Sequence, residues 1–257
     1  MNKPVIIGLG EVGTATFIEL NKKIKCYGVD LNDKRLEELT KQGYEVSNEI
    51  IKSNIYIICV YTTKQVMEVL NKIDKSNNPL IVIESTIIPG TVEKIKKHMK
   101  IDNQKFSLAV FPHRYNPNDK AHYVFNLDRI IGCIDKETEK KVLNFYAKFM
   151  NRNLIHVCPI ELAEIVKPLE NAYRFIEISI AEEIKILCDR YNLDFEKLRK
   201  VMNTKWNIDL KKARDGIGGR CLPKDIKLIA NYFKENIIFN VSINLDKIYK
   251  QYLQKTK

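Results

Sequence analysis

The sequence predicts an α/β protein in which a doubly wound parallel sheet is followed by an all-helical domain with one long helix. Up to about residue 158, short apolar segments of strand length alternate with segments of helical periodicity, which is typical of a parallel sheet with helices on both faces. From Ile160 to about Tyr191, the apolar residues recur at helical spacing. We therefore predict two domains, residues 1–158 and 159–257.

Each predicted element follows from a local pattern of apolar residues between polar or glycine-containing turns. The strands are expected at residues 4–9, 25–30, 55–60, 80–84, 107–110 and 129–134. Helices are expected from the first glycine turn to about residue 23, and over 34–42, 64–73, 91–99 and 136–150. In the second domain, shorter helices at 194–203, 226–235 and 241–254 follow the long one. Pro168 lacks a backbone N–H and crowds the preceding turn, so we expect a kink there.

The composition excludes several classes of protein. With 257 residues, of which 45% are hydrophobic and 29% charged, the chain is neither disordered nor fibrous. Its longest apolar run, residues 55–60, is far shorter than a bilayer span of roughly 20 residues, and its first residues do not resemble a secretory signal. We therefore expect a cytoplasmic protein without membrane contact. The six cysteines form no CxxC pair, so we expect neither a metal site nor a disulfide framework.

The net charge of +11 comes mainly from lysines that are spread along the chain and interleaved with acidic residues. This distribution favours a solvated surface over a nucleic-acid groove. A positive field would also attract a small anionic substrate.

The first glycine cluster lies between the first predicted strand and the first predicted helix and consists of Gly8, Gly10 and Gly13. This G-x-G-x-x-G spacing allows a tight turn that brings a helix N-terminus to a pyrophosphate. Asp30 ends the second predicted strand, where a carboxylate can accept both ribose hydroxyls and would repel a 2′-phosphate. We therefore predict a Rossmann-like domain that binds NAD, with Lys34 and Arg35 leaving NADP as the alternative.

The second glycine cluster, in residues 216–219, directly precedes Cys221. The neighbouring cations Arg220 and Lys224 favour the thiolate form of a cysteine, which makes Cys221 a candidate nucleophile. The alternative is a glycine-rich hinge between domains that contains an ordinary cysteine.

On the long predicted helix, Lys167 and Asn171 are four residues apart. They therefore share a face and could reach one substrate oxygen together. Glu164 and Glu170 flank them, so an exposed stripe of ion pairs is the simpler interpretation of these residues taken alone.

Five segments together resemble the UDP-glucose/GDP-mannose dehydrogenase family. They are GLGEVGTA from residue 8, YGVDLNDKRLEEL from residue 27, ESTIIPGT over 84–91, AEIVKPLENAYR over 163–174 and GIGGRCLPKD over 216–225. The last two are the most specific, and all five follow the order of the family.

The resemblance implies an NAD-dependent oxidation of a sugar's primary alcohol to a carboxylate, which gives a uronic acid for polysaccharide biosynthesis. The sugar would be nucleotide-linked, and two hydrides would be transferred through a cysteine-bound thiohemiacetal and thioester. The helical domain would form a homodimer.

Motif matching also implies a role for each candidate residue. Cys221 would be the nucleophile, Lys167 would stabilise the oxyanion or take the alcohol proton, and Asn171 would hold a water or the same oxygen. Asp225 would orient the lysine and the water, and Thr86 would hold the catalytic water near the cofactor. The cofactor contacts would come from Gly8, Gly10, Glu11, Val12, Gly13, Asp30, Arg35, Val60, Thr62, Ser85 and Thr86.

The sequence departs from the family pattern in three places. The family's glutamate base for thioester hydrolysis is replaced by His113, which could do the same work or be an ordinary loop histidine. The segments after Gly43 and after Val60 are shorter than in the family. The resemblance ends near residue 254, before the family's C-terminal nucleotide-binding domain. We therefore expect either a separate partner subunit or a substrate held without the usual nucleotide pocket.

Two other functions are compatible with the same residues. The first is a two-electron hydroxyacid or alcohol dehydrogenase with Lys167 as the base, which would form one NADH per substrate and leave Cys221 without a role. The second is a catalytically altered NAD-binding subunit of a sugar-processing partner. The joint presence of Cys221, Lys167, Asn171 and Asp225 argues against such a loss of activity.

Overall fold

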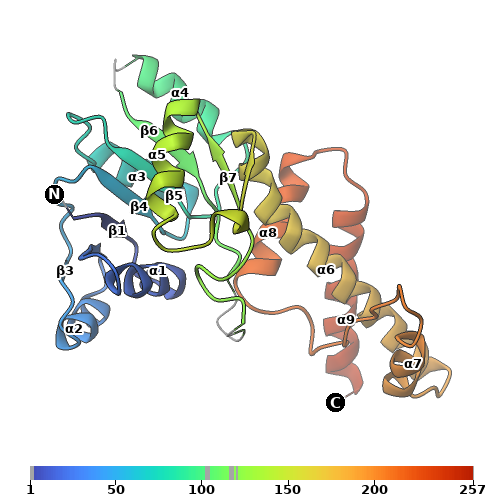
Figure 1. Cartoon of the computed structure of the whole chain (residues 1–257). Helices are drawn as coiled ribbons and strands as arrows, with labels where there is room; N and C mark the ends of the chain where they lie inside the picture. Colours follow the sequence, from blue (N-terminus) through green and yellow to red (C-terminus); the bar gives the residue numbers. More distant parts are fainter. Residues whose placement is uncertain (1–2, 102–104, 116–118, 120, 257) are drawn as a thin grey trace. The chain divides into compact units, whose positions relative to one another are not determined.

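The computed structural model describes residues 3–101, 105–115, 119 and 121–256. The chain divides into two compact units, Met1–Lys167 and Pro168–Lys257 (Figure 1). This division falls inside helix α6 (Ile160–Arg190), whereas we expected a boundary after residue 158. Ile160 and Ala163 pack into the same core as the sheet, so the first turns of this helix belong to the first unit.

The first unit is built on one sheet, whose strands occur in the spatial order β3-β2-β1-β4-β5-β6-β7-β8. The strands are β1 (Val5–Ile7), β2 (Tyr27–Val29), β3 (Val46–Ser47), β4 (Ile55–Ile58), β5 (Leu80–Ile83), β6 (Ser107–Val110), β7 (Arg129–Cys133) and β8 (Ile155–Cys158). Strands β6 and β7 are antiparallel, and the other neighbouring pairs are parallel. The chain progresses outward from β1 in one direction and then from β4 in the other, which is the doubly wound order.

Helices cover both faces of this sheet, as the sequence predicts (Figure 1). They are α1 (Glu11–Asn21), α2 (Asp33–Lys41), α3 (Thr63–Lys72), α4 (Thr91–Ile101), α5 (Lys136–Tyr146) and the short 3₁₀ turn η1 (Arg152–Leu154). Because side chains alternate along a strand, Ile58 faces a core shared with α3 and α4, whereas Ile57 faces a core shared with α1 and α5.

Strands β3 and β8, which form the two sides of the sheet, were not predicted from the sequence. Strand β3 is only two residues long and half-buried. In β8, His156 and Val157 are exposed. An edge strand has one neighbour and less surface to bury, so neither segment carries the apolar run that identifies a central strand.

The second unit contains the rest of α6, with α7 (Phe195–Met202), α8 (Cys221–Tyr232) and α9 (Ile238–Thr256). Helix α6 runs through Pro168, and the expected kink stays a prediction. Helix α8 begins five residues before the expected start at Ile226, because Pro223 lies in its first turn, where a missing N–H costs nothing. In the described residues, every helix is too short or too polar to cross a membrane.

The second unit also buries a carboxyl group, Glu182 of α6. Among the described residues, neither of its oxygens has a hydrogen-bond partner. Burial and the nearby carboxylate of Asp246 raise the pKa of Glu182 to about 8, against the opposing effect of Lys250 and Arg214. Glu182 is therefore mainly neutral at pH 7, which avoids an unpaired charge in the core.

We expect Glu182→Gln to remove a pH-dependent loss of stability. The pKa of Glu182 rises from 4.5 to about 8 on folding, so the folded wild type is stabilised at low pH and loses that stability as the pH rises through this window. Glutamine does not titrate. The free energy of unfolding of the variant, relative to that of the wild type, should therefore increase between about pH 5 and pH 8, as measured by urea denaturation. The exposed Glu235→Gln is the control, and equal pH profiles for the two variants would contradict the assignment.

Candidate active site

The predicted cofactor residues come together at the end of the sheet where the parallel strands have their carboxyl ends. The glycine turn follows β1, Asp30 follows β2, residues 60–62 follow β4, and residues 85–86 follow β5. These strands are neighbours and parallel, so their carboxyl ends lie at the same edge. The order of connection reverses between β1 and β4, which is where ligands bind in open α/β sheets.

The three glycines of the first turn serve different purposes. Gly8 has a φ of +93°, and a Cβ there would lie 2.8 Å from the backbone of Cys59. A Cβ on Gly13 would lie 1.8 Å from the carbonyl oxygen of Gly8, so this glycine lets α1 pack against the turn. Gly10 is the N-cap of α1 and provides no side-chain cap, and a Cβ there would meet nothing within 4 Å. The first N–H groups of α1 thus face an open approach that suits a pyrophosphate.

Asp30 is held by the same turn. Its carboxylate accepts hydrogen bonds from the N–H of Leu9 at 2.5 Å and the N–H of Asn32 at 2.8 Å. These bonds keep the carboxylate directed at the glycine turn, where the ribose of a dinucleotide is expected. Arg35 donates to Glu38 at 3.0 Å, so its guanidinium already has an acidic partner. The fixed Asp30 carboxylate, which would repel a 2′-phosphate, favours NAD over the NADP alternative.

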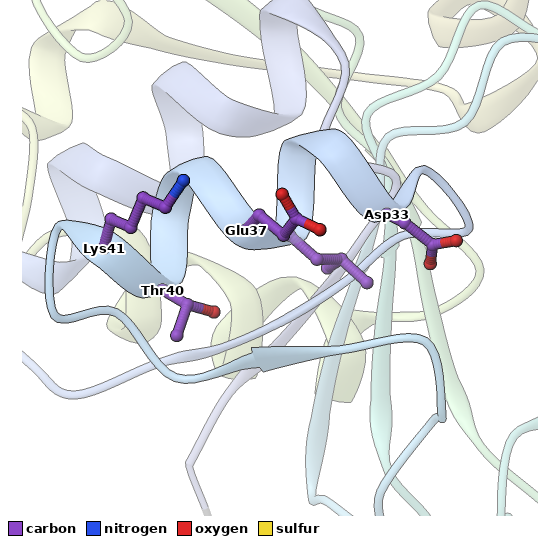
Figure 2. A pocket seen from close by; sticks show the side chains of 5 residues that line it. Asp33, Glu37, Thr40 and Lys41 are labelled. Carbon is purple, nitrogen blue, oxygen red and sulfur yellow. The ribbon is translucent and has the colours of Figure 1, made fainter.

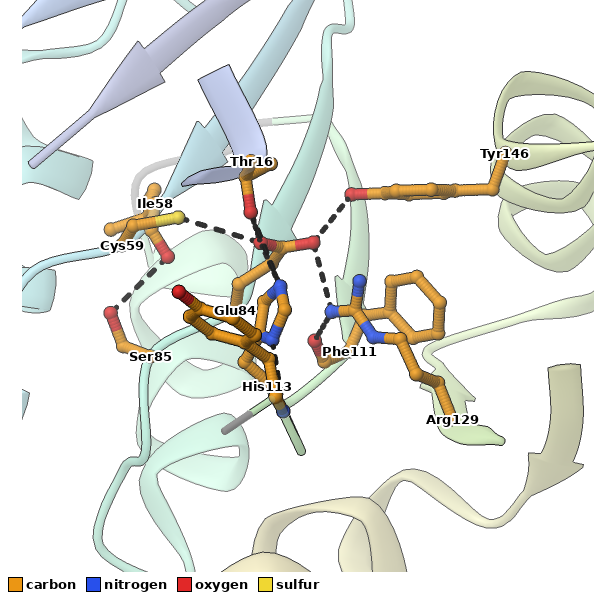
Figure 3. A network of polar contacts seen from close by, with 10 residues as sticks. Thr16, Ile58, Cys59, Glu84, Ser85, Phe111, His113, Arg129 and Tyr146 are labelled. Atoms are coloured by element: carbon orange, nitrogen blue, oxygen red, sulfur yellow. Dashed lines mark hydrogen bonds and ion pairs between the residues drawn. The ribbon is translucent and has the colours of Figure 1, made fainter. Parts of the chain in front are cut away.

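The other predicted cofactor residues divide into structural and accessible positions. Thr62 caps α3 and exchanges hydrogen bonds with Gln65 in a capping box. Ser85 is buried and donates to the carbonyl oxygen of Ile58 at 3.2 Å (Figure 3). Thr86 is half-buried in the loop after β5. The remaining positions, all partly or fully exposed, are Glu11, Val12 and Val60.

A buried polar network that the sequence analysis missed lies beside this edge (Figure 3). Glu84, at the end of β5, accepts hydrogen bonds from Arg129 at 2.9 Å, Tyr146 at 3.1 Å and Thr16 at 3.0 Å. Burial alone would raise the pKa of Glu84, but the Arg129 charge and these bonds outweigh it and lower that pKa. The only signal in the sequence is a charged residue directly after a buried strand.

His113 belongs to this network rather than to an open loop (Figure 3). Its Nδ1 accepts from the N–H of Tyr115 at 3.3 Å, and its Nε2 lies 3.2 Å from the hydroxyl of Thr16. Since Nδ1 accepts, the neutral ring carries its proton on Nε2 and donates to Thr16, which donates to Glu84. Burial and the charge of Arg129 lower the pKa of His113 to about 3. This geometry favours an imidazole with a packing role over a general base.

Glu164 joins the start of α6 to the start of α4. Its carboxylate accepts from the N–H of Val92 at 2.7 Å and the N–H of Gly90 at 3.1 Å, so it caps α4 from another element. Lys167 lies one turn further along α6. The acid therefore anchors the helical segment that carries this lysine, and it is not part of an exposed stripe of ion pairs.

Within the second unit, two predicted residues are hydrogen-bonded to each other, and a third lies one helical turn from them. Asn171 donates to a carboxylate oxygen of Asp225 at 2.6 Å, and both side chains are buried. Asp225 and Cys221 are four residues apart on α8 and therefore share a face of that helix. Cys221 is exposed at the first residue of α8, where backbone N–H groups are free to stabilise an anion.

A shallow hollow along α2 is not part of this site. Figure 2 shows its lining side chains, all from one helix: Asp33, Leu36, Glu37, Thr40 and Lys41. None of them is a predicted site residue, and nothing about the hollow points to a ligand. In the part of the chain that the structure describes, no three His, Cys, Asp or Glu side chains are arranged to hold a metal ion.

The strand order, the glycine turn and Asp30 define a dinucleotide-binding protein with an attached helical unit. Residues 43–150 match the NAD binding domain of the UDP-glucose/GDP-mannose dehydrogenase family, and residues 161–245 match its central domain. The chain belongs to this family, as its motifs predict. The match to the NAD binding domain also confirms the predicted cofactor.

Individual relatives show the same relationship. UDP-N-acetyl-D-glucosamine 6-dehydrogenase of Salmonella typhi is 29% identical over 87% of this chain and 61% of its own length. UDP-N-acetyl-D-mannosamine dehydrogenase of Methanococcus vannielii is 29% identical over 88% of this chain and 60% of its own. The chain thus spans about three fifths of these curated relatives. The solved UDP-D-ManNAc dehydrogenase of Pyrococcus horikoshii has the same fold, with a TM-score of 0.83 at 24% identity over 97% of this chain and 69% of its own.

We expect His113→Gln to reduce the acid sensitivity of folding. The pKa of His113 falls from 6.5 to about 3 on folding, so the unfolded chain takes up a proton that the folded chain refuses, and wild-type stability declines as the pH falls from 6.5 towards 3. Glutamine retains a donor for Thr16 but does not titrate. Urea denaturation between about pH 7.5 and pH 4.5 should show a shallower decline for the variant. The exposed His98→Gln should keep the wild-type slope, and a wild-type slope in His113→Gln would exclude this pKa.

Proposed function

We propose that the protein oxidises the primary alcohol of a nucleotide-linked sugar to a carboxylate, with NAD as the hydride acceptor and Cys221 as the nucleophile. The observation that carries this proposal is the cluster in the second unit, where an exposed cysteine begins α8 one turn from the buried Asn171–Asp225 pair. Relatives named UDP-N-acetyl-D-glucosamine 6-dehydrogenase and UDP-N-acetyl-D-mannosamine dehydrogenase support the same substrate class.

The proposed reaction has two oxidations and one hydrolysis. NAD, held by the glycine turn and Asp30, would supply the hydride acceptor for each oxidation. In the first, Lys167 takes the alcohol proton as the hydride leaves, and an aldehyde forms. The Cys221 thiolate adds to the aldehyde carbon to give a thiohemiacetal, and loss of the second hydride gives a thioester. Water then cleaves the C–S bond, which releases the carboxylate and restores the thiol.

The neighbouring residues would stabilise charges and hold water in these steps, and none of them would be oxidised or reduced. Lys167 would stabilise the oxyanion of each tetrahedral species. Asn171 and Asp225 would hold the water for hydrolysis, and their 2.6 Å hydrogen bond fixes the amide orientation. Thr86, in the loop after β5, would hold a water near the cofactor. We assign no proton transfer to His113, because both its ring nitrogens are engaged.

The number of NADH molecules formed per sugar tests the proposal. With excess NAD and limiting UDP-glucose, UDP-N-acetylhexosamine or GDP-mannose in turn, the oxidised sugar should yield two NADH and one uronic acid. Cys221→Ala should abolish acid formation, since no thioester can form, while Cys158→Ala should retain it. The products are followed by absorbance and mass spectrometry.

Each other outcome has a defined meaning. One NADH per substrate, unchanged in Cys221→Ala, would replace the proposal with the two-electron dehydrogenase that uses Lys167 as its base. No turnover of any nucleotide sugar would refute catalysis by this chain alone and favour a partner subunit that completes the substrate pocket.

We also propose that the chain forms a homodimer through α6. Four exposed apolar side chains lie on one face of this helix, at intervals of four and seven residues: Leu169, Tyr173, Ile180 and Leu187. An apolar stripe with this repeat is self-complementary, because the same stripe on a second copy offers matching surface. The stripe is also unusual for a surface left in water.

We expect Ile180→Asp to shift the protein from dimer to monomer in sedimentation equilibrium, because the aspartate would place a charge within the apolar stripe. Arg174→Asp, which changes the charge on another face of the same helix, should leave the dimer intact. A wild-type monomer at micromolar concentration, or equal effects of both substitutions, would refute this interface.

A further inference from the structure

Two side chains of helix α9 form hydrogen bonds with the backbone of the loop that leads to Cys221. The N–H of Ile217 donates to Asp246 Oδ1 at 2.7 Å, and the carbonyl oxygen of Ile217 accepts from Lys250 Nζ at 2.9 Å. Lys250 also donates to Asp246 Oδ2 at 2.7 Å. Both polar groups of one loop residue are therefore bonded to two side chains that lie one turn apart on α9. We call Asp246 and Lys250, with the Ile217 backbone they hold, the α9 clasp.

The clasp is a built feature rather than a chance surface contact. Ile217 is 1% exposed and Asp246 is 6% exposed. Gly216 has a φ of +84°, and a Cβ there would lie 2.4 Å from Lys250 Cε. Position 216 therefore requires glycine for two reasons: the backbone has a positive φ, and a Cβ would collide with the aliphatic part of the Lys250 side chain. The Lys250 side chain is half-exposed, and its bonds are charge-assisted, a class that is shorter and stronger than neutral hydrogen bonds.

The loop beyond the clasp has little else to fix it. Gly218 and Gly219 follow Ile217, and a Cβ on either would meet nothing within 4 Å. Gly219 also has a φ of +81°. Glycines without packing contacts leave the backbone with many accessible conformations. The position of the Cys221 thiol therefore depends on the residues before and after these glycines that are held by contacts with other helices.

Cys221 lies midway between two such fixed points. Four residues before it, Ile217 is held by the clasp. Four residues after it, Asp225 is held by Asn171 through a buried hydrogen bond. The second anchor belongs to the proposed catalytic cluster, whereas the first comes from a helix that contributes no candidate catalytic residue.

We propose that Asp246 and Lys250 are positioning residues, which act through Ile217 to set the place of the Cys221 thiol at the start of α8. This inference rests on the proposed function of Cys221. Small displacements of a nucleophile are costly because the reacting atoms must meet at close range and correct angle. Loss of the clasp should therefore reduce turnover more than cofactor binding.

The test uses Lys250→Met, which keeps the length and packing of the stem against Gly216 but removes the charged donor. Lys250→Arg retains a donor, and the exposed Lys247→Met on the same helix is the matched control. Hydrogen exchange of the amides of residues 217–221, followed by mass spectrometry, should be about tenfold faster in Lys250→Met, whereas the control keeps the wild-type rate. Lys250→Arg should restore most of the protection.

Kinetics then separate a positioning role from a purely structural one. In Lys250→Met, kcat for sugar oxidation should fall about tenfold while KM for NAD stays unchanged, and Lys250→Arg should recover most of kcat. Unchanged exchange would refute the clasp, and faster exchange with unchanged kcat would refute its role in positioning Cys221.

The exchange experiment requires no substrate, so it decides the clasp independently of the proposed function. If the wild type oxidises no nucleotide sugar but Lys250→Met still loosens residues 217–221, the proposed function fails and the clasp remains as a structural anchor only. That result would overturn the positioning role.

Discussion

The buried ion pair between Glu84 and Arg129 is the interaction on which the first unit most depends. Removing two charges from water is costly, and the cost is recovered only where the remaining polar atoms are bonded as well. Glu84 meets this condition through Thr16 of α1 and Tyr146 of α5. Among the described residues, Arg129 forms hydrogen bonds only through Nη2, and its guanidinium carbon lies 3.7 Å from the centre of the Phe111 ring. One carboxylate thus joins two helices and two strands directly before the loop that carries Thr86. The edge of the sheet that receives the cofactor is therefore supported from within the core.

Burial also explains why each unit holds a titratable group that is mainly neutral at pH 7. An environment of low polarity disfavours the charged form, so it lowers the pKa of His113 and raises the pKa of Glu182. A charged His113 would compete with Arg129 for Glu84, and a charged Glu182 would repel Asp246. Because His113 and Glu182 are neutral, they do not disturb the neighbouring ion pairs Glu84–Arg129 and Asp246–Lys250.

The two units contribute different parts of the proposed chemistry. The first supplies the glycine turn and Asp30, which use backbone approach and a fixed carboxylate to receive a dinucleotide. The second supplies a thiol on a loop whose glycines leave access open, while Ile217 and Asp225 on either side of it are held. Access and precise placement are opposing requirements for a nucleophile, and separate residues meet them here.

The sequence by itself determined the alternation of strands and helices, the glycine turn, the place of Asp30 and the family, because each depends on neighbouring residues whose spacing is visible in the chain. Only the tertiary structure decided the partners of Glu84, the state of His113 and the grip of α9 on Ile217. Glu84 and Arg129 are 45 residues apart, and Ile217 and Asp246 are 29 apart. Local patterns carry no information on such pairs, because burial and contact between distant segments arise only when the chain has folded.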